Sequence, residues 1–385
     1  MEKHTNGGEP VTRRQALVML AITPPILLGL TSDIPQAQLD IMRTGIIRLA
    51  MLSFWHVHAG DYQHQALTNH ATEIIAIWDE TPDRGRAQAQ SLGVPFYESL
   101  YELLAQADVD GVIVDAPTTM HRDVMVAAAQ AGKHIFTEKV LAPTLHECNE
   151  IVAAVNKAGV KLMVSLPRLY AGSTLAIKDI LDRRLLGEVT QVRTRASHDG
   201  ALRTLLNPQG WLPPYFFNPQ QTAGGAMIDL GAHPMYLARL FLGLPESVSA
   251  IYGYITGRAV EDNAVVVLRY PQGAIGIVEA GFVNPFSPFT IEAHGTEGSL
   301  LYGTPDNSLR IRSSNVARPA SNNWSMWTDI PPDQPTAFQQ WISHIQNGTT
   351  ATENIVIATD LSMLMEAANL SAKSNQPVWL DMLAR

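Results

Sequence analysis

Short runs of consecutive apolar residues alternate with helical patterns in the first half of the chain. The runs are IIRLAML (46–52), EIIAIWD (73–79), VDGVIVDAP (109–117), KHIFTEK (133–139) and VKLMVSL (160–166). Runs of this kind are typical of strands buried on both faces of a parallel sheet, because helices cover both sides. Glycines close several of the intervening helical segments, which is the usual stop signal. We therefore expect an α/β, Rossmann-type doubly wound domain over residues 45–165.

The second half of the chain shows a different pattern, in which apolar and polar residues alternate. The expected strands are SVSAIYGYIT (247–256), NAVVVLRY (263–270), AIGIVEAGFV (274–283), FTIEAHGT (289–296) and GSLLYG (298–303). Alternation indicates a sheet with one covered face and one freer face. We expect an α+β domain over residues 166–385, with an open, largely antiparallel sheet and C-terminal helices. Its free face predicts a homo-dimer or a homo-tetramer.

Composition supports a packed protein and excludes some partners. The 385 residues are 46% hydrophobic and 16% charged, as in a globular chain with a substantial core. The net charge of −9 argues against nucleic acid, which requires a concentrated basic face. The single cysteine, Cys148, excludes intrachain disulfides and cysteine-rich zinc sites.

Residues 1–42 have the character of a leader and are set apart from the fold. Arg13 and Arg14 precede an apolar run, 16–30, that is too short and too interrupted by prolines for a transmembrane helix. This arrangement resembles a twin-arginine export signal. We expect export to a periplasmic or extracytoplasmic compartment, with a cytoplasmic protein as the alternative.

Six segments occur in an order and spacing that resemble the Gfo/Idh/MocA family of NAD(P)-dependent oxidoreductases. They are VDGVIVDAPTTMHRDVMVAAAQAGKHIFTEKV (109–140), LLGEVTQVR (185–193), GGAMIDLGAHPMYLARLFLG (224–243), VEDNAVVVLRYPQGA (260–274), HGTEGSL (294–300) and EAANLSAKSNQPVWL (366–380). The resemblance runs from Gly45 to Leu380. It implies a nucleotide-binding domain, a substrate domain, and an enzyme that acts on CH–OH groups of a small molecule.

The segment TEKV (137–140) matches the family's Glu-Lys-Pro signature, with Val140 in place of the proline. The resemblance implies that Lys139 hydrogen-bonds the substrate hydroxyl and the nicotinamide ribose. A cation there would stabilise an alkoxide as hydride leaves. Glu138 would orient the loop. The alternative is a surface ion pair, which is normally worth little.

The segment DLGAH (229–233) places Asp229 and His233 four residues apart, on one face of an expected helix. The resemblance implies that His233 is the acid/base group and that Asp229 holds it or the substrate. Histidine suits proton transfer near pH 7, although a core histidine bonded to its own helix is the plain alternative. Glycines 224 and 225 would let the backbone approach the substrate. Arg168 matches a family arginine that either bridges the domains or touches substrate.

Polar residues at the ends of the second and fourth strands complete the expected cofactor site. Asp79 ends the second strand, where a carboxylate accepts bonds from both adenosine ribose hydroxyls and repels a 2′-phosphate. NAD is therefore expected over NADP, with an N-cap for the helix opening at Thr81 as the alternative. The resemblance places Pro117 and Thr118 on the nicotinamide side. His121 is expected to be a helix-entry residue without chemistry.

The turn after the first strand lacks the Gly-x-Gly-x-x-Gly pattern of dinucleotide-binding domains. Ser53, Trp55 and His58 stand roughly where the glycines would be. In one interpretation the turn still binds NAD, with Ser53, His56 and backbone amides as phosphate contacts. In a second, the cofactor site has decayed. A third makes His56 and His58 a metal pair, which needs further ligands on later strands of a closed barrel. No such barrel is expected, so no metal is predicted.

These observations predict an NAD(P)-dependent oxidoreductase acting on a secondary alcohol of a sugar or cyclitol-like substrate. Two alternatives stay open. One is a protein that binds a ligand or a partner without redox turnover on a decayed dehydrogenase scaffold. The other is an NAD-retaining glycosidase, which would show no net consumption of the cofactor.

Overall fold

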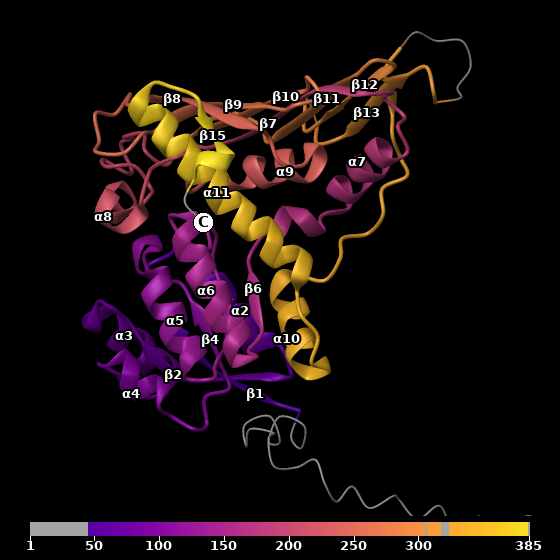
Figure 1. Ribbon diagram of the computed structural model, residues 1–385. Helices are drawn as coiled ribbons and strands as arrows, with labels where there is room; N and C mark the ends of the chain where they lie inside the picture. The colour runs from indigo at the N-terminus through magenta and orange to yellow at the C-terminus, as the bar shows by residue number, and fades with distance from the viewer. Residues whose placement is uncertain (1–44, 305, 317–322, 384–385) are drawn as a thin grey trace, which may run out of the picture.

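The computed structural model describes residues 45–304, 306–316 and 323–383. The leader and its predicted export signal lie outside these residues. The chain forms two units, each built on one sheet, and the first sheet lies below the second in Figure 1. This arrangement confirms the predicted fold class, a Rossmann-type sheet followed by an α+β unit.

The first sheet has six strands in the order β3-β2-β1-β4-β5-β6, and its pairings are parallel. The strands are β1 (Ile47–Leu52), β2 (Thr72–Trp78), β3 (Phe96–Tyr97), β4 (Gly111–Val114), β5 (His134–Thr137) and β6 (Leu162–Val164). The order reverses between β1 and β4, which makes their carboxyl ends the switch point where ligands bind in such sheets.

Helices cover both faces of the first sheet, as the uninterrupted apolar runs predict. One face carries α2 (Ala59–Thr68), α3 (Pro82–Leu92) and α10 (Ala337–Asn347), and the other carries α4 (Leu100–Leu104), α5 (His121–Gln130) and α6 (Leu145–Ala158). In β1, Leu49 and Met51 face the first group of helices, whereas Ala50 and Leu52 face the second. These four consecutive residues of β1 are therefore all buried, two under each layer of helices.

Helix α10 comes from the far end of the chain and packs on the first sheet. Its fully buried Trp341 lies 5.7 Å from the Phe136 ring of β5, and Phe338 lies 5.5 Å from the same ring. A Cβ added at Gly111 of β4 would lie 3.1 Å from Trp341. The first domain thus extends beyond the predicted span 45–165, because its core is completed by a helix from the predicted second domain.

The second sheet has nine strands in the order β14-β13-β12-β11-β7-β10-β9-β8-β15. They are β7 (Val189–Ser197), β8 (Ser247–Gly253), β9 (Asn263–Arg269), β10 (Ile275–Gly281), β11 (Thr290–Gly295), β12 (Gly298–Tyr302), β13 (Leu309–Ser313), β14 (Ser325–Met326) and β15 (Val378–Trp379). Within this sheet, β7 and β10 are the only described neighbours that pair in parallel.

One face of the second sheet is covered and the other is open. Helix α9 (Ala232–Leu242) packs on β7 and β10, and α11 (Thr352–Ser374) packs on β8. Helix α7 (Gly172–Asp182) lies beside α9. On β9 the inward residues are buried, whereas Val265 and Val267 on the outer face are 39% and 41% exposed.

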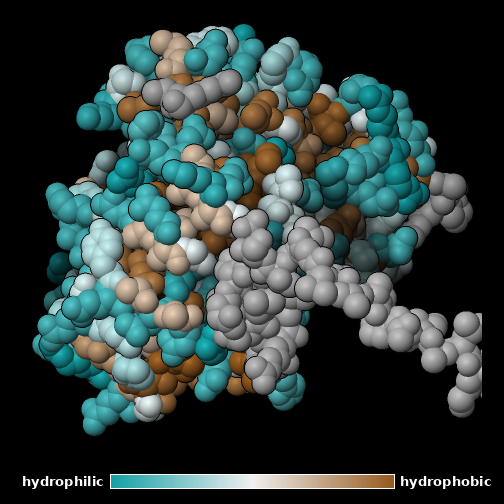
Figure 2. Space-filling view, turned by 60° about the horizontal axis from the view of Figure 1, so that its bottom comes forward, coloured by the Kyte–Doolittle hydropathy of each residue, from teal (hydrophilic) through white to brown (hydrophobic). Residues whose placement is uncertain are grey.

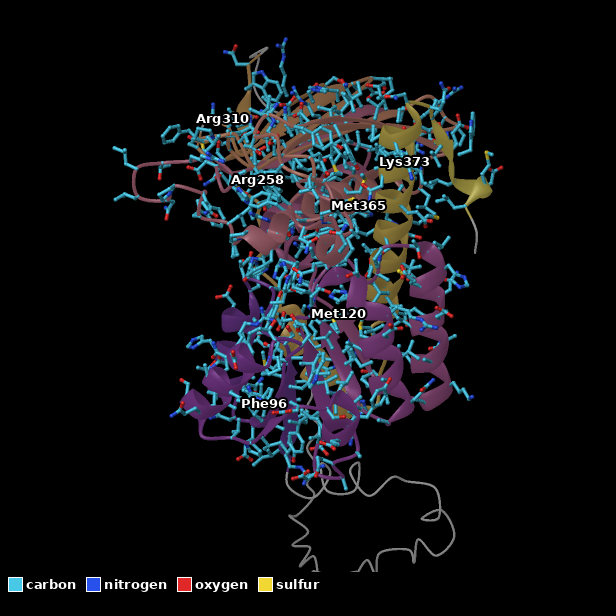
Figure 3. All side chains as sticks on the ribbon, turned by 90° about the vertical axis from the view of Figure 1, so that its left-hand side faces the viewer. Phe96, Met120, Arg258, Arg310, Met365 and Lys373 are labelled. Atoms are coloured by element: carbon cyan, nitrogen blue, oxygen red, sulfur yellow. The ribbon has the colours of Figure 1, made fainter. Side chains whose placement is uncertain are left out.

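Helix α11 joins the two units. By length and composition it could cross a membrane, but 56% of its most apolar stretch is buried inside the protein. It packs against α6 of the first unit and against α9 of the second. Figure 3 shows Met365 partway along it and Lys373 near its upper end. It is therefore the shared core helix of the two units.

Figure 2 shows the lower part of the molecule, where hydrophobic areas are interspersed among hydrophilic residues.

Candidate active site

The candidate site lies at the junction of the two units. The segments that follow β1, β4 and β5 meet there, as expected for the carboxyl ends of parallel strands. The second unit contributes residues 224–229, which precede α9. Most of the residues proposed from the sequence fall within this region.

Lys139 and Asp229 form an ion pair across the junction. The Lys139 Nζ lies 2.6 Å from Asp229 Oδ1, and the lysine side chain is 2% exposed. Burial alone would lower the pKa of Lys139, but the carboxylates of Asp229 and Glu138 outweigh it and raise the pKa. Lys139 therefore remains a cation at neutral pH. It can stabilise a negatively charged oxygen but does not take up a proton.

The expected pairing of Asp229 with His233 does not form. Helix α9 begins at Ala232, so Asp229 lies in the turn before it rather than on the same helix face. The His233 Nδ1 lies 3.2 Å from the Tyr236 hydroxyl instead. Burial, together with the Lys139 cation, lowers the pKa of His233 to about 3. His233 is therefore neutral at pH 7, and the partner that Asp229 positions is Lys139.

Ser53 and Trp55 turn inward in the segment that replaces the glycine-rich turn. Ser53 is fully buried with a φ of 79°, and its Oγ accepts bonds from Trp55 N at 3.0 Å and Arg84 Nη2 at 3.3 Å. Trp55 stacks on Phe216 of the second unit with ring centres 4.9 Å apart. Its Nε1 donates to Gln221 Oε1 at 3.1 Å. The hydroxyl expected to bind phosphate is thus occupied within the protein.

The backbone amides of this turn also have partners within the protein. Those amides are Phe54 N (to Asp79 Oδ2), Trp55 N (to Ser53 Oγ), His56 N (to Asp115 O), His58 N (to His56 Nδ1) and Ala59 N (to His56 O). A dinucleotide-binding turn offers such amides to the pyrophosphate. In addition, the first turn of α2 carries the anionic Asp61, which opposes an anion at that helix end.

The space between the turn and the second unit is nearly filled. The cavity lined by Trp55, Lys139, Phe216 and Asp229 measures about 10 Å³, roughly the room for one water molecule. The residues of the turn therefore do not fit a dinucleotide in this arrangement.

Asp79 is held by protein groups rather than left free for a ribose. Arg84 Nε lies 2.8 Å from Asp79 Oδ2, and Arg84 Nη2 lies 2.7 Å from Oδ1. The amides of Phe54 and Thr81 donate to the same carboxylate at 2.9 and 2.7 Å. Asp79 thereby ties the turn after β1 to the end of β2.

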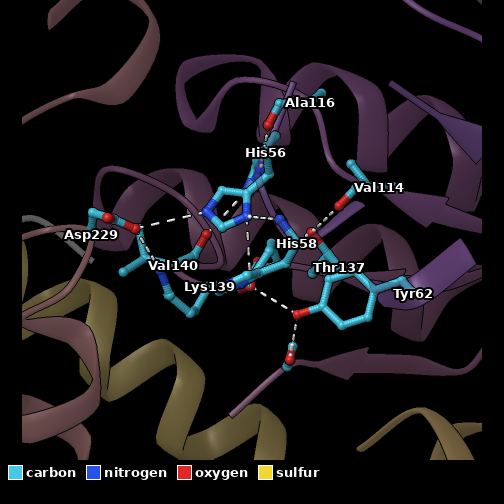
Figure 4. Close-up of polar contacts among 12 residues, drawn as sticks. His56, His58, Tyr62, Val114, Ala116, Thr137, Lys139, Val140 and Asp229 are labelled. Carbon is cyan, nitrogen blue, oxygen red and sulfur yellow. Dashed lines mark hydrogen bonds and ion pairs between the residues drawn. The ribbon is translucent and has the colours of Figure 1, made fainter. Parts of the chain in front are cut away.

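Glu138 is buried and is the centre of a polar cluster. Figure 4 labels His58, Tyr62 and Lys139 of this cluster. Its Oε1 lies 2.5 Å from His58 Nδ1 and accepts a hydrogen bond from the Tyr62 hydroxyl at 2.8 Å. Its Oε2 accepts from Lys139 N at 2.6 Å. Burial would raise the pKa of Glu138, but His56 and Lys139 outweigh it and hold the pKa well below the ordinary value. Glu138 is thus an anion that organises its own loop.

His56 connects this cluster to the ion pair. Its Nδ1 lies 3.8 Å from Glu138 Oε1, and its Nε2 lies 3.7 Å from Asp229 Oδ1. His56 is 6% exposed and lines the small cavity beside Lys139. The sequence proposed His56 as a phosphate contact, whereas the structure directs its ring toward two carboxylates.

Three further residues of the site were missed by the sequence analysis. Tyr62 also bonds Ser165 Oγ at 2.7 Å, and both are buried. Asp115 is fully buried, and neither of its carboxyl oxygens has a hydrogen-bond partner. Burial and the nearby Glu138 raise the pKa of Asp115 well above its ordinary value. The spacing of four between His58 and Tyr62 was the available signal for Tyr62, because it places them on one helix face.

The other proposed residues take varied places. Thr118 lines the small cavity, and Pro117 immediately precedes it. Arg168 is exposed, and its guanidinium lies 4.1 Å from the ring centre of Phe289 in the second unit. His121 is buried between carbonyl oxygens of Val140 and Ala116, at 2.9 and 3.1 Å, which fits the predicted structural role.

A parallel Rossmann sheet, a second mixed sheet and a buried lysine at their junction define a class of two-domain oxidoreductases. The chain belongs to the Gfo/Idh/MocA family of that class. Residues 56–166 match the profile of the oxidoreductase family with an NAD-binding Rossmann fold, and residues 174–301 match that of the GFO/IDH/MocA C-terminal domain. The predicted enzyme class is thereby confirmed.

Curated relatives and solved structures agree with this membership. The chain is 26% identical to scyllo-inositol 2-dehydrogenase (NAD(+)) of Bacillus subtilis, over 88% of this chain and 96% of that protein. It is 30% identical to 1,5-anhydro-D-fructose reductase of Ensifer adhaerens, over 60% and 68% of the two chains. The fold matches an aldose-aldose oxidoreductase of Caulobacter crescentus with a TM-score of 0.71 at 20% identity, covering 87% and 99%.

Proposed function

We propose that this protein oxidises or reduces a secondary alcohol on a sugar or cyclitol, with NAD(P) as the cofactor that the family implies. The observation that carries the proposal is the Lys139 Nζ, fixed 2.6 Å from Asp229 at the junction of the two units. The names of the inositol dehydrogenase and anhydrofructose reductase relatives support the substrate class.

The site residues have distinct tasks in this proposal. Interconversion of an alcohol and a ketone places negative charge on the substrate oxygen, and the buried Lys139 cation stabilises that charge. Asp229 positions Lys139 through the ion pair. His233 is neutral at pH 7, because its pKa is lowered to about 3 by burial and Lys139. It is therefore able to accept a proton, although as a weak base.

Nucleotide entry in this proposal requires the Trp55 side chain to leave its stack on Phe216. The stack and the internal hydrogen bonds of the turn occupy the place where the family fold receives the pyrophosphate. The position of Asp79 at the end of β2 supports NAD over NADP, provided that its carboxylate is released from Arg84.

The closed turn favours a second candidate function. A protein that has lost nucleotide binding would use the same junction to bind a sugar-like ligand or a partner without redox turnover. The observation that favours this function is the small size of the cavity beside Trp55, about 10 Å³, which leaves no room for a nucleotide. Such a protein would keep its ligand affinity after substitution of Lys139 and would hold no nucleotide.

Nucleotide content separates the two functions. We expect the protein, purified from its native host and denatured, to release NAD(H) or NADP(H) detectable by mass spectrometry. NADH titration of the nucleotide-free protein is expected to show micromolar binding. Absence of nucleotide, together with no binding at millimolar NADH, would eliminate the oxidoreductase proposal in favour of the second candidate.

We also propose that the protein is a homo-oligomer. The open face of the nine-stranded sheet carries Ile251, Val265, Val267 and Ile275, which are 79%, 39%, 41% and 45% exposed. Apolar side chains gathered on one sheet face are typical of a surface that a second copy covers. Light scattering is expected to report a dimer or a tetramer, and a monomer at micromolar concentration would refute this.

A further inference from the structure

We propose that His56, His58 and Glu138 bind a divalent first-row metal ion. The sequence argued against a metal because the two histidines would need further ligands on later strands of a closed barrel, and no such barrel was expected. The structure supplies the third ligand from the segment after β5, which lies beside the β1 turn. This inference does not depend on the proposed function, because it concerns cation binding alone.

The three donor groups already converge. One ring nitrogen of each histidine and a carboxylate oxygen of Glu138 all lie within 4.8 Å of one another. Zinc holds nitrogen and oxygen ligands at about 2.0–2.2 Å, so neighbouring ligand atoms stand roughly 3.5 Å apart in a tetrahedral site. The His56–Glu138 separation of 3.8 Å is close to that spacing. The His58–Glu138 separation of 2.5 Å must widen, which is feasible because the His58 side chain is 40% exposed.

The orientation of His56 suits a metal ligand. The His58 backbone amide donates to His56 Nδ1 at 3.2 Å, so the ring proton belongs on Nε2, and the Nδ1 lone pair must exchange this hydrogen bond for the metal ion. Nε2 lies 3.7 Å from Asp229 Oδ1, on the side away from the cluster. Metal-bound histidines usually present their other ring nitrogen to a carboxylate, which fixes the ring and raises its basicity. His56 presents its Nε2 to the Asp229 carboxylate in this sense, at a separation longer than a hydrogen bond.

Glu138 is similarly braced, and a second buried carboxyl group, that of Asp115, lies in the same region of the core. The Tyr62 hydroxyl holds Glu138 Oε1 at 2.8 Å and is itself bonded to Ser165. Asp115 is fully buried beside this group with both carboxyl oxygens unpartnered. Buried polar atoms without a partner are rare, and an ion is one of the recognised explanations.

A path leads from solvent to the cluster. A cavity of about 390 Å³ between α2, α10 and the segment after β6 is lined by His58, Tyr62 and Ser165. A metal ion can enter there, and a water molecule can complete its coordination. Three protein ligands with one open position are the pattern of catalytic rather than structural zinc sites. Two imidazoles and one carboxylate suit Zn²⁺, and also Co²⁺ as a spectroscopic substitute.

Metal content after loading tests the proposal. The purified protein is incubated with Zn²⁺, desalted and measured by inductively coupled plasma mass spectrometry. We expect about one zinc per chain in the wild type and in the control variant His64→Ala, whose histidine is exposed on α2. We expect His58→Ala and Glu138→Gln to weaken zinc affinity by at least ~100-fold, because each removes a ligand. Circular dichroism confirms folding, and the partly exposed His58 provides a variant that leaves the apolar core intact.

Cobalt provides a second measurement on the unaltered protein. Tetrahedral Co²⁺ with mixed nitrogen and oxygen ligands is expected to give visible absorption bands that excess Zn²⁺ removes. A wild type that retains no zinc, or folded His58→Ala protein that retains as much as His64→Ala, would overturn the proposal. Neither result bears on nucleotide content, so failure here is distinct from failure of the proposed function.

Discussion

Lys139→Met is expected to lower kcat/KM for sugar or cyclitol oxidation by about 10²–10³-fold, which is the usual effect of removing one preorganised group that stabilises an oxyanion. Lys139 is a buried cation that lines the small cavity at the junction, and methionine keeps most of its length without its charge. The measurement is NAD(P)⁺ reduction with the best substrate from a panel of sugars and cyclitols.

Stability must be separated from catalysis in this experiment. Removing Lys139 leaves the Asp229 carboxylate without its ion-pair partner. Breaking a buried pair costs about 3–5 kcal/mol, and the lower end applies because the Asp229 side chain is 21% exposed. The double variant Lys139→Met/Asp229→Asn is expected to recover most of the stability but not the activity. The surface variant Lys178→Met is the control, and full activity in Lys139→Met would end the proposed mechanism.

Trp55→Ala is expected to strengthen NADH binding by at least ~10-fold while destabilising the fold. The indole occupies the turn where the family fold receives the pyrophosphate, so its removal opens that space without the need to displace the ring. Trp55 is 3% exposed, and truncating a buried tryptophan costs about 3–5 kcal/mol. Calorimetric titration with NADH and thermal unfolding measure the two effects.

A matched tryptophan makes this result interpretable. Trp211 is 48% exposed and donates its Nε1 hydrogen bond to Asp199, so Trp211→Ala is expected to change neither quantity appreciably. If Trp55→Ala fails to fold, Phe216→Ala opens the same stack from the second unit. Folded variants that bind NADH no better than the wild type would show that the filled turn is not what opposes the nucleotide.

Much of the architecture could be predicted from the sequence, because strand and helix patterns are local. The apolar run 46–52 contains β1, and Gly159 ends α6 in the left-handed conformation that glycine adopts most readily. The start of the helix in segment 229–243 was predicted less well. Its helix begins at Ala232, and the difference removed the expected geometry of Asp229 with His233. Element boundaries depend on local turns, which periodicity describes poorly.

The location of helix α10 was not predictable from its own pattern. Its apolar face is clear in the sequence, but the surface that receives it consists of β5, β6 and Gly111. An amphipathic helix indicates which side is buried and gives no information on the partner. Membership of α10 in the first unit therefore required the tertiary structure.

The sequence predicted the candidate site residues better than it predicted which of them contact one another. The sequence identified Lys139, Glu138 and Asp229 through family motifs. It identified His56 through its place in the turn after the first strand, and all four residues meet at the junction. It assigned Asp229 to His233, because spacing along one helix was the only proximity visible. Asp115 was assigned no role, although it follows the fourth strand as Asp79 follows the second.

The sequence alone determined the parallel sheet, the family and the place of Lys139, since each rests on local periodicity or on an ordered set of motifs. Only the tertiary structure showed that Trp55 lies across the turn and that Glu138 meets His58, 80 residues earlier in the chain. The physical reason is that parallel strands bring their carboxyl ends to one edge of the sheet whatever their separation in sequence. Which side chains then touch is decided by packing between the two units.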